Sequence, residues 1–215
     1  MHTTESAPAF SYACGMISAK LARGERVLLQ DVSFSLSSGE RMAIIGETGS
    51  GKTMLALSIL GLLPANVRMQ SGYIQMDGAA LPSGKQLQTL RGDKLVYIPQ
   101  NGAEFLLPAR TVRKQLYDSL KKLGLPRKAF PASAAEKLRL AGFDAPETIL
   151  DKYPFQLSGG MAQRVTIALA ACSRARLLIA DEPTNGLDEA GRAQFFALLD
   201  SIFPDAAKLI ITHDI

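Results

Sequence analysis

The most constraining feature of this 215-residue chain is a glycine-rich segment that runs from Gly46 to Thr53. It follows the apolar run Met42–Ile45 and precedes an apolar stretch, Lys52–Leu63, that stops at Pro64. The run predicts a strand buried on both faces of a parallel sheet, and the stretch predicts a helix. A glycine-rich turn in this context matches G-x-x-x-x-G-K-[ST], whose backbone N–H groups and helix start bind phosphates. The sequence therefore predicts an α/β fold with a phosphate-binding loop.

Each residue type in this loop has a predicted role. The glycines let the backbone wrap a phosphate without side-chain clashes. Lys52 supplies a positive charge for the β- and γ-phosphates, and Thr53 offers a hydroxyl to Mg²⁺. The predicted phosphate-binding residues are Gly46, Glu47, Thr48, Gly49, Ser50, Gly51, Lys52 and Thr53.

Two adjacent carboxylates supply the second half of the predicted site. The apolar strand Leu177–Ala180 delivers Asp181 and Glu182 at its carboxyl end, where α/β sheets bind ligands. Asp181 is expected to hold Mg²⁺, directly or through water, and Glu182 to orient and polarise the attacking water. Taken alone, the pair could be surface acids in a turn before Pro183. Together with the glycine-rich loop it indicates a P-loop NTPase, without saying of which kind.

The run Leu157-Ser158-Gly159-Gly160-Met161, followed closely by Gln163-Arg164, narrows the class. Here the sequence resembles the ABC ATPase family, whose signature is LSGGQ with a following Gln-Arg; this copy has Met161 in place of Gln. Ser158 and two glycines at a helix start form a second anion-binding site, although a plain helix N-cap also explains Ser158. In that family two ATPase domains sandwich two ATP molecules head to tail. The resemblance thus implies that Leu157, Ser158, Gly159, Gly160 and Met161 contact ATP held by a partner subunit.

Three further positions extend the resemblance. Gln100 matches the Q-loop glutamine, which touches Mg²⁺ or water and senses the membrane partner; Asp188 matches the D-loop; and His213 matches the switch histidine that contacts the γ-phosphate. Each residue also has an explanation without function. Gln100 and His213 could be ordinary polar residues at strand ends, and Asp188 could belong to an Asn-Gly turn. The implied catalytic residues are Glu182, His213 and Gln100, and the implied Mg²⁺ ligands are Thr53, Gln100 and Asp181.

The segments Leu63–Arg68, Ser71–Ile74 and Tyr153–Met161 look like those of nickel and oligopeptide import ATPase subunits. The resemblance implies a subunit that binds and hydrolyses ATP with Mg²⁺ to power a membrane transporter, an importer of peptides, nickel or metal chelates. Implied partners are a second ATPase subunit (a heterodimer favoured over a homodimer), two integral-membrane permease subunits and an extracytoplasmic substrate-binding protein. The implied location is peripheral, on the cytoplasmic face of the inner membrane.

The chain departs from the family at three places. Arg23 stands where an aromatic residue stacks on adenine, Asn101–Phe105 replaces the usual proline-containing run, and the sequence stops at Ile215, two residues after His213. The last departure predicts either a fragment or a naturally short chain. These differences leave open a non-hydrolysing or regulatory ABC-type nucleotide-binding module. A soluble ABC ATPase acting on DNA or ribosomes is a further alternative, but its usual coiled-coil insert or second ATPase domain is missing here; a nucleotide kinase would not need the signature.

The predicted fold is an α/β P-loop NTPase core of the ABC ATPase type, with an antiparallel β subdomain and an inserted α-helical subdomain. Residues 1–10 are expected to be a disordered leader and 11–215 one ABC ATPase domain, with the helical insert at about 101–165. Within the insert, the irregular segment Gly102–Pro108 carries the apolar run Phe105-Leu106-Leu107. We expect this segment to dock a cytoplasmic helix of the permease, the alternative being that the run fills the insert's own core.

Bulk properties exclude several other classes. Lys and Arg number 24, Asp and Glu 20, and there is no Trp, so neither a basic face nor a stacking platform for nucleic acid is predicted. Cys14 and Cys172 lack metal-like spacing and are expected to be small buried hydrophobes in a reducing compartment, with a disulfide less favoured. No apolar stretch reaches the roughly 18 residues of a transmembrane span.

Overall fold

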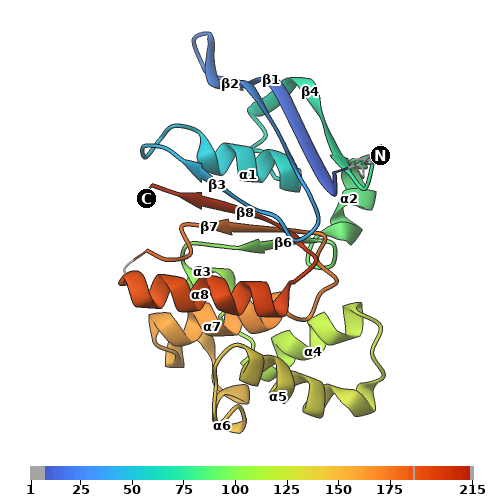
Figure 1. The fold of residues 1–215 in the computed structure, drawn as a ribbon, viewed down its shortest axis with the longest axis vertical. Coiled ribbons are helices and arrows are strands. Elements are labelled where there is room, and N and C mark those ends of the chain that lie inside the picture. Colours follow the sequence, from blue (N-terminus) through green and yellow to red (C-terminus); the bar gives the residue numbers. More distant parts are fainter. Residues whose placement is uncertain (1–7, 186, 214–215) are drawn as a thin grey trace, which may run out of the picture. The chain divides into compact units, whose positions relative to one another are not determined.

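The computed structural model describes residues 8–185 and 187–213, which divide into two compact units (Figure 1). Unit 1 contains residues up to Arg91, the strand segment Arg176–Asp181 and the segment that begins at Asp205. Unit 2 contains Gly92–Ala175 and Glu182–Pro204. Most of the predicted leader, residues 1–7, lies outside the described residues, as does residue 186 of the predicted D-loop.

An antiparallel sheet forms one layer of unit 1, with strand order β2-β1-β4-β5. Its strands are β1 (Phe10–Lys20), β2 (Glu25–Leu36), β4 (Val67–Met76) and β5 (Ala79–Ala80). In β1, side chains alternate between buried and half-buried from Phe10 to Cys14, as expected of a sheet with one face on a core. Asp77 and Gly78 form the hairpin turn between β4 and β5: both residues have positive φ (52° and 76°), as a tight two-residue turn requires.

Three parallel strands form the second layer of unit 1, with β8 (Ala207–Thr212) paired to β3 (Arg41–Ile45) and to β7 (Leu177–Asp181). Every residue of β7 is buried, as its continuous apolar sequence predicts. The prediction that Met42–Ile45 is buried on both faces is wrong. No residue of β3 is buried, and Ile45 keeps 49% of its surface exposed.

Helix α1 (Lys52–Leu60) packs against strands of both layers in unit 1, with contacts to β2 and β7 (Figure 1). It ends three residues before the predicted Leu63. Gly61 adopts a left-handed conformation, φ 61°, and its N–H bonds to the carbonyls of Leu57 and Ser58, which closes the last turn. A short helix, α2 (Gly84–Leu90), follows later in the unit.

Unit 2 is built mainly from helices. They are α3 (Gly102–Phe105), α4 (Val112–Lys122), α5 (Phe130–Leu140), α6 (Glu147–Leu150), α7 (Gly159–Ala170) and α8 (Glu189–Ile202), with strand β6 (Leu95–Ile98) and 3-10 turns at Arg127–Ala129 and Pro154–Gln156. Helix α7 contacts α3, α4, α5 and β6, so it forms the centre of the helical packing. One face of α4 is apolar, and its residues Val112, Leu116 and Leu120 are fully buried.

Both cysteines are free and buried, as predicted from their spacing. Cys172 lies just beyond α7, and its thiol donates to the Ala168 carbonyl at 3.4 Å. Burial raises the pKa of the Cys172 thiol to about 12. Cys172 therefore offers no reactive thiolate at the surface.

Candidate functional site

The glycine-rich loop joins β3 to α1 within unit 1. Two of its glycines have left-handed backbones, with φ of 84° at Gly49 and 96° at Gly51. A Cβ at Gly51 would also lie 2.7 Å from Leu29 Cδ2 and 2.8 Å from the Leu28 carbonyl oxygen. Gly51 therefore meets two demands that only glycine satisfies, a positive φ and a close approach to β2. Its position at the N-cap of α1 leaves the first N–H groups of that helix available at the loop.

Lys52 folds back onto this loop. Its Nζ donates to the carbonyl oxygen of Gly46 at 2.5 Å and to that of Glu47 at 2.9 Å. The turn is closed further by the Ser50 N–H, which donates to Glu47 O at 3.2 Å. The loop thus places a cation against its own backbone, where an incoming phosphate would compete with the two carbonyls for the ammonium.

Asp181, at the buried end of β7, lies beside the first turn of α1. The Thr53 hydroxyl donates to Asp181 Oδ2 at 3.4 Å. The hydroxyl of the residue that follows Lys52 is thus in contact with a carboxylate from the end of β7. Oxygen ligands of this kind suit Mg²⁺, which commonly takes one or two protein ligands and completes its shell with phosphate oxygens and water. Such a site does not need a larger acidic cluster, and the described residues contain no group of three or more His, Cys, Asp or Glu placed to hold a metal.

Glu182 follows Asp181 directly and has a strained backbone. Its φ is 47°, in the left-handed region that non-glycine residues rarely adopt. Its carbonyl accepts from the Asn185 N–H at 3.3 Å, which closes a turn immediately after β7. A conformation of this type costs on the order of 1–3 kcal/mol and is concentrated at functional sites. Strain of this kind fits the functional role predicted for Glu182. Asp181 is the last residue of its segment of unit 1, and Glu182 is the first residue of the next segment, which belongs to unit 2.

The signature residues begin α7 in unit 2. Ser158 is the N-cap, and its hydroxyl accepts from the Met161 N–H at 3.3 Å, so the capping explanation considered from the sequence applies within this chain. Gly159 and Gly160 are exposed, and a Cβ at either position would have no other atom within 4 Å among the described residues. Among the described residues, nothing in this part of the fold therefore requires glycine at these two positions.

The remaining predicted residues occupy loop positions. Gln100 is exposed, two residues beyond β6 in unit 2. Asp188 is the N-cap of α8, and its Oδ1 accepts from the Gly191 N–H at 2.8 Å. His213 is exposed directly after β8 in unit 1. Arg23 is exposed in a turn that the Leu21 N–H closes on Gly24 O at 3.0 Å.

Unit 1 thus brings together the glycine-rich loop, Thr53 and Asp181, and it also carries His213. Gln100, Glu182, Asp188 and the signature belong to unit 2.

The sequence analysis did not single out Gln115, which is 7% exposed and whose side chain forms hydrogen bonds to a loop of unit 2. A signal was present, because Gln115 is a polar residue between Val112 and Leu120, two apolar residues that recur with Leu116 at helical spacing.

A scan of protein-family models matches residues 29–185 to the model described as ABC transporter. That range covers more than half of the sequence and contains the glycine-rich loop, the signature and the Asp181-Glu182 pair. The chain belongs to the ABC transporter family.

Curated relatives agree with this assignment. The uncharacterized ABC transporter ATP-binding protein YejF of Escherichia coli K12 is 41% identical over 196 residues, which are 88% of this chain and 37% of YejF. The oligopeptide transport ATP-binding protein OppD of Bacillus subtilis is 37% identical, over 93% of this chain and 57% of OppD. The nickel import ATP-binding protein NikD of Brucella abortus is 35% identical, over 88% of this chain and 72% of NikD. The chain thus spans little more than a third of the first relative and little more than half of the second.

Solved structures agree on the fold. The ATP-binding cassette MJ0796, described as a dimer in a post-hydrolysis state bound to ADP and Pi, superposes with a TM-score of 0.80 at 24% identity. The match covers 95% of this chain and 88% of MJ0796. The predicted fold class and the predicted resemblance to nickel and oligopeptide import subunits are both confirmed. Among the described residues, no helix combines the length and the apolar composition needed to cross a bilayer.

Proposed function

We propose that this chain binds and hydrolyses ATP to power a membrane ABC transporter that imports peptides, nickel or metal chelates. The observation that carries the proposal is the loop of unit 1. It holds Lys52 against its own carbonyls and sets the Thr53 hydroxyl 3.4 Å from Asp181. The cation of Lys52 and the hydroxyl of Thr53 at the start of α1, with the Asp181 carboxylate beside them, suit a nucleoside triphosphate with its Mg²⁺.

The chain's own residues divide the chemistry. Lys52 attracts the β- and γ-phosphates, and Thr53 and Asp181 supply oxygen ligands for Mg²⁺, whose charge neutralises the phosphate oxygens. Glu182 orients and polarises the attacking water. Gln100 contributes to the Mg²⁺ or water position, and His213 contacts the γ-phosphate. Catalysis here consists of positioning and charge stabilisation, so no covalent intermediate is involved.

The signature works on ATP held by a second ATPase subunit. Support comes from Gly159 and Gly160, which are exposed at a helix N-terminus and have open space where a side chain would stand. A phosphate or a partner backbone can approach that face because no Cβ is present. A heterodimer with a related subunit is favoured over a homodimer, as the family resemblance implies. Asp188 lies at the start of α8. As the D-loop residue, it faces the second ATPase subunit in the proposed dimer.

The membrane partners are two permease subunits, supplied with substrate by an extracytoplasmic binding protein, and the ATPase binds peripherally on the cytoplasmic face. The proposed docking surface consists of Phe105 and Leu107, at the end of α3 and just after it. Both are about half exposed, at 48% and 54% of their surfaces, whereas Leu106 between them is buried at 1%. Two large apolar side chains that are exposed and close in sequence suit a contact with apolar residues of a cytoplasmic helix of the permease.

A regulatory module that binds nucleotide without hydrolysing it is the second candidate, favoured by Arg23 at the position expected for a base-stacking aromatic. One experiment separates the two. Equilibrium binding of a fluorescent ATP analogue is measured on the purified chain, and phosphate release is measured with the partner subunit and Mg²⁺ present. Both are measured for wild type, for Lys52→Ala and for the control Lys85→Ala, which changes an exposed lysine of α2. The transporter-ATPase proposal predicts binding and turnover in wild type and in the control, with both lost in Lys52→Ala. Binding without turnover, in the presence of the partner subunit and Mg²⁺, would favour the regulatory module.

A further inference from the structure

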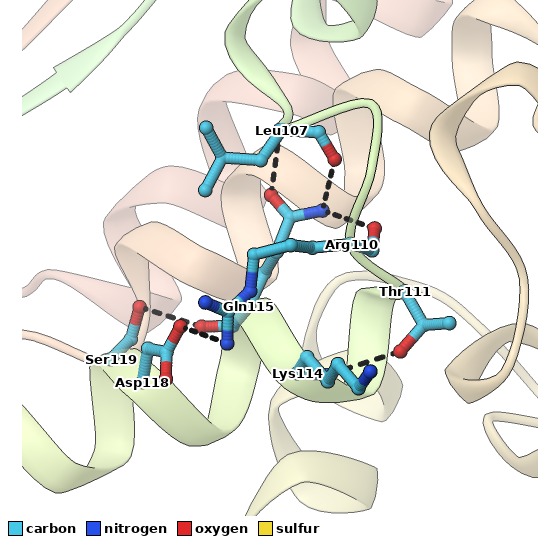
Figure 2. Close-up of polar contacts among 7 residues, drawn as sticks. All are labelled: Leu107, Arg110, Thr111, Lys114, Gln115, Asp118 and Ser119. Atoms are coloured by element: carbon cyan, nitrogen blue, oxygen red, sulfur yellow. Dashed lines mark hydrogen bonds and ion pairs between the residues drawn. The ribbon is translucent and has the colours of Figure 1, made fainter.

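The segment between α3 and α4, residues 106–110, is held by one side chain of α4 (Figure 2). That side chain is Gln115, a buried amide on an otherwise apolar helix face. Its Oε1 accepts from the Leu107 N–H at 2.9 Å. Its Nε2 donates to the carbonyl oxygens of Leu107 at 3.3 Å and Arg110 at 3.0 Å. The amide thus binds both polar groups of the Leu107 backbone, as a neighbouring strand would.

Other contacts around the segment are weaker anchors. The Arg110 N–H donates to Leu107 O at 3.1 Å and forms a turn. Arg110 also pairs with Asp118 at 2.7 Å, as Figure 2 shows, but both side chains are about half exposed, and exposed pairs contribute little stability. The Thr111 hydroxyl caps α4 by accepting from the Lys114 N–H at 3.4 Å. Gln115 is therefore the buried group that ties this segment to the helix.

Phe105 and Leu107 are exposed even though the backbone beneath them is fixed. Leu106 anchors the segment inward, and Gln115 fixes the next residue, so the two exposed side chains project from a constrained backbone. A constrained contact segment avoids most of the ordering entropy that a flexible loop loses on binding. The arrangement suits a surface that must bind and transmit movement repeatedly.

We propose that Gln115 is a positioning residue. It holds the Leu107 segment in the conformation that presents Phe105 and Leu107 to the membrane-embedded partner, and it takes no part in nucleotide chemistry. The identity of that partner, a permease subunit, rests on the proposed function. The clamp itself is a property of this chain alone, so the two can be tested apart.

Two substitutions remove the clamp in different ways. Gln115→Met keeps the approximate volume and loses all three hydrogen bonds. Gln115→Glu keeps the acceptor for the Leu107 N–H but, when ionised, faces two carbonyl oxygens without a proton to donate; on protonation it regains one donor. Ser119→Ala is the matched control. The Ser119 hydroxyl donates to the backbone carbonyl oxygen of Gln115 at 3.2 Å, so its loss leaves the three hydrogen bonds of the Gln115 side chain in place.

Hydrogen exchange at the Leu107 amide tests the clamp. In Gln115→Met the protection factor should fall about tenfold or more, because a net loss of one or two neutral hydrogen bonds has this size. Ser119→Ala should stay within about twofold of wild type. In Gln115→Glu the protection should rise again as pH falls and the carboxyl becomes protonated. Unchanged protection in both Gln115 variants would overturn the proposal, and the Glu variant decides should the Met variant not fold.

Cysteine crosslinking in membranes that contain the assembled transporter tests the functional role. Phe105→Cys, in a background lacking Cys14 and Cys172, should capture a permease subunit. Adding Gln115→Met should lower the yield at least about threefold, while phosphate release by the purified subunit stays within about twofold. An unchanged yield, despite lost protection at Leu107, would refute the positioning role. Absence of capture with native Gln115 would refute the docking assignment of the proposed function, and the positioning role with it, whereas the exchange data would still report the clamp.

Discussion

Replacing Gly160 by alanine separates the stability of this chain from its activity. Gly160 lies in the first turn of α7 and is exposed, and an added Cβ would meet no other atom within 4 Å. Alanine is favoured over glycine inside a helix by about 0.5–1 kcal/mol, with less expected in the first turn. We therefore predict that the free energy of unfolding stays the same or rises by up to about 1 kcal/mol.

The same methyl group should cost most of the activity. If the face at Gly160 approaches a nucleotide on a second subunit, a Cβ displaces that nucleotide by about an ångström, which can lower turnover about a hundredfold. Affinity of the isolated monomer for ATP should be unaffected, because its own phosphate loop is intact. The measurements are urea unfolding, phosphate release with the partner subunit and equilibrium binding to the monomer. Turnover within about threefold of wild type, at normal stability, would refute the composite-site reasoning.

Three further predictions concern other parts of the chain. Gly51→Ala should destabilise unit 1 by about 2 kcal/mol or more in urea unfolding, because it combines a left-handed φ with contacts of 2.7 and 2.8 Å to β2. The buried Cys172 thiol, with a pKa raised to about 12, keeps its proton when the unfolded chain, with a thiol pKa near 9.0, has lost it. Stability should therefore fall as pH rises above 9, by about 1 kcal/mol between pH 8 and 10, and this part of the decline should be absent in Cys172→Ala. Single cysteines at positions 104–107, in a background without Cys14 and Cys172, should capture the permease in an ATP-dependent way; efficient capture from positions 144–148 instead would place the docking surface elsewhere on unit 2.

The sequence predicted most of the nucleotide-binding unit because its signals are local. Glycine at fixed positions, an apolar run before it and an apolar stretch that stops at Pro64 after it together specify strand, loop and helix. The Asp77-Gly78 hairpin and the Thr111 cap of α4 were predictable for the same reason, since each depends on a few adjacent residues. Burial of β3 was predicted wrongly, because an apolar run does not say whether other elements will pack over both faces of the strand.

Helix α8 was missed although its signals exist. Asp188 caps the helix, and Phe195, Leu199 and Phe203 recur along its buried side. Asp188 was interpreted as a D-loop residue, with an Asn-Gly turn as the alternative, and neither interpretation includes a helix N-cap. Short α3 was expected to be irregular, because four residues carry too little periodicity to detect.

The role of Gln115 could not be derived from the sequence. A buried polar residue can be suspected from a helix pattern, but its partners depend on how the preceding loop folds back. Here the amide reaches Leu107, eight residues away, and Arg110, five residues away. Likewise, the open space around Gly159 and Gly160 depends on how the chain packs, so the sequence alone does not show whether the fold itself requires glycine there.

The most direct test of the central claim is the steady-state rate of phosphate release by Glu182→Gln, measured with the partner subunit and Mg²⁺ beside wild type. The account predicts that ATP binding is retained while turnover falls by two or more orders of magnitude, about the contribution of a positioned general base. A Glu182→Gln chain that hydrolyses ATP at nearly the wild-type rate would contradict the assignment of this residue and the proposed chemistry of the site.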